Sequence, residues 1–209
     1  MRIVRLFSLG CLWLIAGVFD DYIFAAPAFP TDLIAQKAGV TDTQETVNRV
    51  IGLEKANKYD EAAKIWEALV EIRQANFGTK HLSTSYAYNA LGRIYFYQGF
   101  YNKAERYLLK AVAIQEKELE PDALETISSL NSLALVYQAQ SLYSKSEPLF
   151  QKAILISRKT YGEDHINTAL MYRSLGELYS KQGLYRKAEN LFQEVIEIFE
   201  VKLGANHFH

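Results

Sequence analysis

The sequence predicts an all-α fold, a right-handed α-solenoid of about four antiparallel helix hairpins. Three observations support this prediction: an internal repeat of 42 residues, apolar residues at helical spacing within each repeat, and only four prolines in 209 residues. A single hairpin cannot bury both of its apolar faces. Units of this kind therefore stack and share a continuous core.

The repeat is visible in residues that recur at one offset without gaps. Leu91, Leu133 and Leu175 are 42 positions apart. So many coincidences at a single offset are the signature of a repeat architecture. Other series at the same step are Tyr95, Tyr137 and Tyr179; Gln98, Gln140 and Gln182; and Tyr59, Tyr101, Tyr143 and Tyr185.

Each unit is predicted to form two helices joined by a short break. In the third unit the helices are expected at residues 124–140 and 143–159, because apolar residues in both follow one helix face. The short break at 141–142 indicates an antiparallel pair. Gly99 and Gly183 occupy the same break in the second and fourth units, where a left-handed residue ends a helix at little cost. The units are expected at residues 43–84, 85–126, 127–168 and 169–209.

Small and large residues alternate in a fixed way along the second helix of each unit. The small ones are expected to let helices approach closely. The large ones, four positions later, are expected to fill the gap to the next unit. The small residues are Ala62, Ala104, Ser146 and Ala188, and the large ones are Trp66, Leu108, Phe150 and Phe192.

The composition and motifs exclude several classes of function. Lys and Arg number 23 and Asp and Glu number 24, so the chain lacks the surplus of cations that a nucleic-acid-binding protein needs. The sequence contains no Gly-rich phosphate loop, no His-x3-His pair and no Gly-x-Ser-x-Gly motif. We therefore expect no enzyme activity, no cofactor, no small-molecule substrate and no metal site.

Histidines recur in the predicted turns between units. His81, His165 and His207 occupy the same turn of three different units, so they cannot converge on one metal ion. They are expected to be turn or helix-cap residues. His207 and His209, near the last residue, are likewise not expected to bind a metal.

The first 28 residues are predicted to be a signal peptide. Arg2 and Arg5 precede an uncharged stretch at residues 6–19, and Ala25 and Ala28 offer sites for cleavage. The stretch is short for a membrane span, which needs about 20 residues. The sequence therefore predicts an exported protein, periplasmic or secreted, with an N-terminal membrane anchor as the alternative.

Residues 29–42 are expected to form a linker or a loosely docked segment. Cys11, the only cysteine, lies in the predicted signal peptide. A chain from which this segment has been removed has no thiol, which excludes disulfides and thiolate metal sites.

Several motifs resemble those of tetratricopeptide repeats. Leu91, Gly92 and Tyr95 form a Leu-Gly-x2-Tyr element. The period of 42, with Tyr-Gly-Glu-Asp-His-x-x-Thr-Ala at residues 161–169, resembles the kinesin-light-chain type of this repeat. The resemblance covers about residues 43–209 and implies that the first helix of each hairpin lines a concave wall. The element returns as Leu175, Gly176 and Tyr179, followed by Ala188 and Phe192.

The first unit departs from this pattern. Arg49, Val50 and Leu53 stand where later units have Leu, Gly and Tyr, so this unit is expected to be a capping or degenerate repeat. The second unit has Glu-Pro-Asp-Ala at residues 120–123 in place of the Gly-x-x-His turn.

The wall of first helices is the candidate site. Asn and Arg side chains there can hydrogen-bond the backbone or the carboxylates of an extended peptide. Tyr86 and Phe96, expected to be exposed, can anchor an apolar side chain. An ordinary mixed surface is the alternative at these positions. The candidate partner-binding residues are Tyr86, Asn89, Arg93, Phe96, Asn131, Gln138, Arg173 and Glu177, with Ser128, Leu135 and Ser180 on the same wall.

The leading hypothesis is therefore an exported protein–protein interaction scaffold that binds a partner protein or peptide on its concave face. One alternative is a regulatory or targeting fragment of a larger enzyme or signalling protein, because the sequence stops at His209, where a next repeat would begin. Another is self-association through the C-terminal hairpin, involving Phe192 or Phe208.

Overall fold

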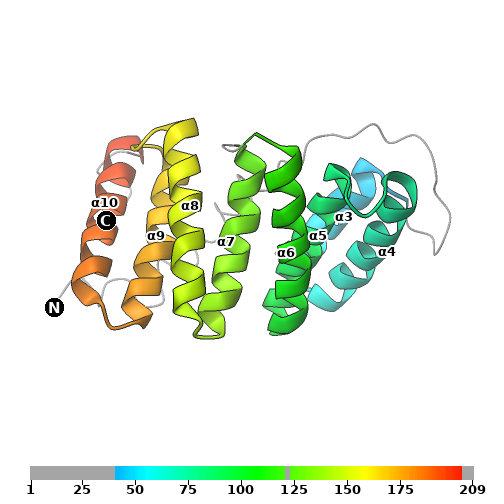
Figure 1. The fold of residues 1–209 in the computed structure, drawn as a ribbon, viewed down its shortest axis with the longest axis horizontal. Coiled ribbons are helices and arrows are strands. Elements are labelled where there is room, and N and C mark those ends of the chain that lie inside the picture. The colour runs from blue at the N-terminus through cyan, green and yellow to red at the C-terminus, as the bar shows by residue number, and fades with distance from the viewer. Residues whose placement is uncertain (1–40, 121–122, 204–209) are drawn as a thin grey trace. The chain divides into compact units, whose positions relative to one another are not determined.

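The computed structural model describes residues 41–120 and 123–203 (Figure 1). The predicted signal peptide, residues 29–40 of the predicted linker, and the histidines at 207 and 209 lie outside these ranges. The described part of the chain is built from helices, without a strand. The helices are α3 (Gln44–Lys55), α4 (Tyr59–Phe77), α5 (Leu82–Tyr97), α6 (Tyr101–Glu118), α7 (Leu124–Ala139), α8 (Tyr143–Tyr161), α9 (Ile166–Lys181) and α10 (Tyr185–Leu203).

The helices pack in chain order as four antiparallel hairpins, α3–α4, α5–α6, α7–α8 and α9–α10 (Figure 1). The second helix of each hairpin packs against the first helix of the next, and α7 also contacts both α5 and α9. In the third hairpin the helices begin at the predicted residues, 124 and 143, and end within two residues of the predicted positions. The predicted all-α repeat solenoid is confirmed.

The turn inside each hairpin has one backbone design. A residue with positive φ ends the first helix, and the next amide donates back to a carbonyl five residues earlier, which is a Schellman motif. In the third hairpin the Leu142 amide lies 2.8 Å from the Tyr137 carbonyl. The first hairpin forms the same bond, at 2.9 Å, from Lys58 to Leu53. The left-handed residues are Asn57, Gly99, Ser141 and Gly183, with φ of 56°, 78°, 60° and 76°.

The turns between hairpins confirm the predicted role of two histidines. His81 precedes α5 and its Nδ1 accepts the Ser83 amide at 3.1 Å. His165 precedes α9 and its Nδ1 accepts the Asn167 amide at 3.1 Å. Both imidazoles also stack on the last aromatic ring of the preceding helix, Tyr161 in the case of His165. They are helix caps, as the sequence predicted.

The large residues of the second helices fill space inside their own hairpin. A Cβ placed on Gly92 of α5 would lie 2.6 Å from Leu108 Cγ of α6, and one on Gly176 of α9 would lie 2.7 Å from Phe192 Cε1 of α10. These contacts lie inside one hairpin, and the prediction that Leu108 and Phe192 fill the gap to the next unit stays a prediction. Because each glycine lacks a Cβ, the large side chain can pack directly against the facing helix.

Neighbouring hairpins are joined by a tyrosine that reaches back to a glutamate of the previous hairpin. The Tyr179 hydroxyl donates to Glu147 at 2.8 Å, and Tyr137 is hydrogen-bonded to Glu105. Burial, followed by this bond, raises the pKa of Tyr137 to about 12. In the first such joint Tyr95 donates to Glu67, one helical turn beyond the position that Glu105 and Glu147 occupy in their helices.

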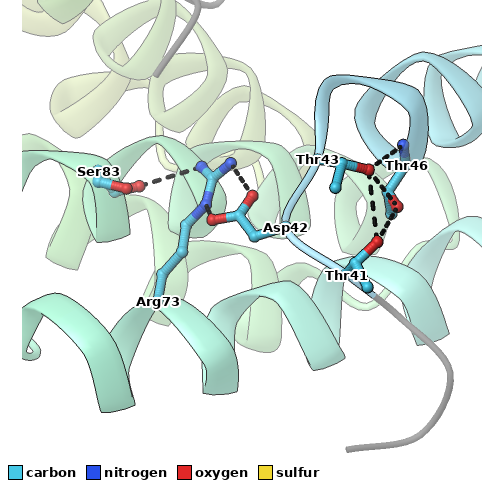
Figure 2. Close-up of polar contacts among 6 residues, drawn as sticks. All are labelled: Thr41, Asp42, Thr43, Thr46, Arg73 and Ser83. Carbon is cyan, nitrogen blue, oxygen red and sulfur yellow. Dashed lines mark hydrogen bonds and ion pairs between the residues drawn. The ribbon is translucent and has the colours of Figure 1, made fainter. Parts of the chain in front are cut away.

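The chain enters the first hairpin through a partly buried ion pair (Figure 2). Arg73 of α4 grips both carboxylate oxygens of Asp42, at 2.8 and 2.7 Å, and also donates to the Ser83 carbonyl at 3.2 Å. On the other side of Asp42, the Thr43 hydroxyl caps α3 by accepting the Thr46 amide at 3.2 Å. Asp42, which falls in the predicted linker, thus ties the start of α3 to α4 and α5.

Candidate functional site

The wall formed by α5, α7 and α9 carries the candidate residues. On this wall a hydrogen bond joins α5 to α7: Asn89 Nδ2 donates to Ser128 Oγ at 3.2 Å. The other polar atom of this amide, Asn89 Oδ1, is buried and has no hydrogen-bond partner in the described chain. Tyr86 lies one helical turn before Asn89 and is half-buried. Burial and the nearby Glu125 carboxylate raise the pKa of Tyr86 to about 12.

Two candidate residues of α7 are more covered than expected. Asn131 and Gln138 are each only 4% exposed. Helical register alone placed them on the wall, but α7 is flanked by α5 and α9 and contacts both. Within residues 41–120 and 123–203, Asn131 Oδ1 and Gln138 Oε1 have no hydrogen-bond partner. A buried acceptor without a donor costs about 1–3 kcal/mol.

Arg93 is neutralised within the array. Its guanidinium lies 3.8 Å from Glu54 of α3, and both side chains are largely buried. Glu54 also accepts a 2.9 Å hydrogen bond from the indole of Trp66. The sequence interpretation missed Glu54. The available signal was an acidic residue at the position that Phe96 occupies one repeat later.

Arg173 and Glu177 of α9 form a second internal pair. Arg173 Nε lies 3.5 Å from Glu177 Oε1, at the favourable i, i+4 spacing. Burial raises the pKa of Glu177, although Arg173 and Lys181 act in the opposite direction. The two candidates therefore bind each other across one helical turn.

Phe96 belongs to a different neighbourhood from the other candidates. It is half-buried rather than exposed, and its ring lies against Tyr97 and Tyr101 at the turn of its own hairpin, with centroids 5.5 and 5.9 Å away. The structure therefore brings Tyr86, Asn89 and Ser128 together across α5 and α7, while Phe96 sits at the far end of α5.

The described residues provide no metal-binding group of three or more His, Cys, Asp or Glu side chains. Among the helices with assigned positions, none combines the length and apolar character needed to cross a bilayer. What the wall offers chemically is hydrogen bonding, mainly from amide groups.

Comparison with protein families finds one match. The family model described as tetratricopeptide repeat matches residues 46–117, 85–154 and 125–200, which overlap and together cover most of the chain. No curated protein matches the sequence.

Solved structures with kinesin-light-chain-like repeats share the fold. Two crystal structures of Podosopora anserina "putative kinesin light chain nearly identical TPR-like repeats" are 23% and 22% identical to this chain. Their TM-scores are 0.63 and 0.62, and the alignments cover 74% and 80% of this chain and 73% and 79% of the other. BtubC (BKLC) from P. vanneervenii is 17% identical, with a TM-score of 0.68 over 96% of this chain and 76% of its own.

Proposed function

Because the chain belongs to the tetratricopeptide repeat family, we propose that it is an exported interaction scaffold that binds a partner protein or peptide on the wall of α5, α7 and α9. Repeats of this family suggest a protein–protein interaction scaffold and typically have no enzymatic activity. Our proposal goes beyond the family in three respects: the wall is the binding face, the ligand is an extended peptide, and the protein is exported.

The observation that carries the proposal is the pair of unpartnered amide oxygens at Asn89 and Asn131. These residues are one repeat apart, so they occupy the same position on two adjacent helices. Each oxygen is a buried acceptor that lacks a donor in the described chain, so a peptide has to displace neighbouring side chains before its backbone N–H groups can reach these oxygens. Supplying two donors would relieve a cost of about 1–3 kcal/mol at each site.

The charges of the wall constrain the kind of partner. Arg93 is paired with Glu54 and Arg173 with Glu177, so the arginines are already balanced by carboxylates of this chain. We therefore propose recognition through the peptide backbone and apolar contacts with Tyr86, without a carboxylate clamp. Affinity of this kind should change little with salt.

A selection experiment tests the wall. Peptides are selected from a random library against the full chain, and their affinities are measured for wild type and for Asn89→Leu/Asn131→Leu, which keeps the branched side-chain shape but removes both amides. We expect at least about tenfold weaker binding, equivalent to about 1.4 kcal/mol. The matched control is Gln151→Ala/Lys152→Ala on the exposed face of α8. Equal affinity of the wall variant and the control for every selected peptide would refute the proposal.

Export is proposed on the sequence of residues 1–28, and an N-terminal membrane anchor is the alternative. Self-association through the last hairpin also stays a prediction. Phe192 packs against Gly176 within that hairpin, so a substitution there would disturb α9 and α10 themselves. A substitution at the exposed Gln193 is a cleaner probe of the outer face of α10.

A further inference from the structure

Three of the turns inside hairpins expose a large apolar side chain at the same position. Phe100, Leu142 and Leu184, the residues before α6, α8 and α10, are 52%, 39% and 41% exposed. Each is followed by a tyrosine, of which Tyr185 is the most exposed. In Figure 1 these turns lie side by side along the lower edge of the view. We call this row of turns, with the first four residues of α6, α8 and α10, the turn edge.

The backbone of these turns does not require an apolar residue. The first hairpin makes the same turn and the same hydrogen bond with Lys58 at the equivalent position. A Schellman turn often brings this residue into contact with the helix it follows, as Phe100 contacts Tyr95, with ring centroids 6.3 Å apart. That contact covers only part of the ring, because half of Phe100 is still exposed.

The turn edge is positively charged. The first turns of α6, α8 and α10 contain no acidic residue, whereas the first turn of α4 contains Asp60 and Glu61. Each turn joins the carboxyl end of one helix to the amino end of the next, so the two helix dipoles oppose each other here and the charge comes from side chains. The basic residues of the turn edge are Lys103, Lys145, Arg186 and Lys187, and one glutamate directly follows it in each helix, namely Glu105, Glu147 and Glu189.

The lysines are held beside the apolar residues by aromatic rings. The ammonium group of Lys103 lies 4.9 Å from the Tyr95 ring and 5.2 Å from the Phe100 ring. Lys145 and Lys187 lie 5.1 and 4.9 Å from the tyrosine rings of their own hairpins. Each turn thus presents one exposed apolar group and one positioned cation.

The opposite ends of the same helices have different chemistry. The turn after α8 carries Glu163 and Asp164, and Glu163 is paired with Arg158. Near the end of α6, Lys117 pairs with Glu118 at 2.9 Å. These two pairs balance charges locally at this end.

We propose that the turn edge rests on an anionic lipid surface. Exposed aromatic and aliphatic side chains enter the headgroup region, and each nearby Lys or Arg adds about 1 kcal/mol of attraction to anionic lipid. The same chemistry recurs at three evenly repeated turns. A laterally uniform surface fits such a repeat, whereas a folded protein partner would be expected to meet distinct pockets.

A local probe tests this proposal in the full chain. Cys11→Ser removes the native thiol, and a fluorophore is attached at Ser144→Cys on the turn edge or, as the control, at Asp164→Cys at the other end of α8. Vesicles contain phosphatidylglycerol and a brominated lipid that quenches only fluorophores at the bilayer. We expect quenching at 144, none at 164, and loss of the quenching in high salt or with purely zwitterionic vesicles.

Variants separate the edge from the N-terminal segment, which is identical in all of them. Lys103→Gln/Lys145→Gln/Lys187→Gln should weaken the contact reported at 144 by about a hundredfold. Phe100→Asn/Leu142→Asn/Leu184→Asn should also abolish the quenching while leaving the helical circular dichroism spectrum unchanged. An unquenched label at 144 on sedimented vesicles, or equal quenching at 144 and 164, would overturn the proposal. So would a dimer that light scattering detects without lipid and that the apolar variant abolishes.

Discussion

The first hairpin and the three later ones perform the same packing task with different residues. In the later hairpins a tyrosine of the first helix donates to a glutamate of the preceding hairpin, and in two of them a glycine seats a large side chain. The first hairpin has Val50 at the glycine position and Leu53 at the tyrosine position. It relies instead on Asp42–Arg73 and on Glu54 between Trp66 and Arg93.

The difference shows what the repeat motif is for. The tyrosine of the Leu-Gly-x2-Tyr motif bonds one hairpin to a glutamate of the preceding hairpin. Within residues 41–120 and 123–203 no such repeat precedes the first hairpin, and its α3 is only 12 residues long, against 16 for α5. Polar pairs that have no counterpart in the later described hairpins stabilise this end, so the two regions should respond to different mutations.

The largest effect is expected at the ion pair that is specific to the first hairpin. Asp42→Ala removes the carboxylate to which the Arg73 guanidinium, only 7% exposed, donates two hydrogen bonds. Breaking a buried pair in this way should lower the free energy of unfolding by about 3 kcal/mol. Hydrogen exchange should accelerate in α3 and α4 and stay unchanged in α9 and α10. Asp42→Ala/Arg73→Met, which removes both charges, should recover part of the loss; no recovery would mean that the pair is not the cause.

The next largest effect is expected at the glycine that is specific to the later hairpins. In Gly176→Ala the new methyl group meets the Phe192 ring at 2.7 Å, which should cost about 2 kcal/mol in a urea melt. Gly52→Ala is the control in the first hairpin. Its Cβ would meet nothing within 4 Å, so better helix propensity should stabilise the protein by up to about 1 kcal/mol. The comparison fails if both substitutions have the same sign.

The smallest effect is expected at the tyrosine–glutamate joint. Tyr137→Phe removes the bond to Glu105 and should cost about 1 kcal/mol at neutral pH. The pKa of Tyr137 is raised from 10.0 to about 12, so the folded state keeps the proton that the unfolded chain releases. The stabilisation is complete below pH 10 and is lost as the pH rises toward 12. Thermal melts should therefore show the gap between wild type and Tyr137→Phe closing over that range, whereas Tyr185→Phe, at an exposed ring, should match wild type at neutral pH.

The sequence was informative where residues repeat and silent where they do not. Residues that recur every 42 positions predicted the local structure correctly: Leu91 a helix, Gly99 a turn and His165 a helix cap. Glu54 with Arg93 and Asp42 with Arg73 are single long-range pairs, which no period reveals.

Exposure on the wall was also beyond a single-helix argument. Register placed Asn131 and Gln138 on the correct helix, but their burial depends on the neighbouring helices. The signal peptide lies outside the described residues and stays a prediction.

The tyrosine–glutamate joints have a consequence for how the array comes apart. Each joint ties a hairpin only to the one before it. A terminal hairpin therefore has one stabilising interface and a central hairpin has two, so unfolding should begin at an end and advance inward. Amide exchange should then be slowest in α7 and faster toward both ends. A ligand that bridges α5 and α7 would stabilise the interface between the second and third hairpins. Its binding would be detected as slower amide exchange in these two hairpins.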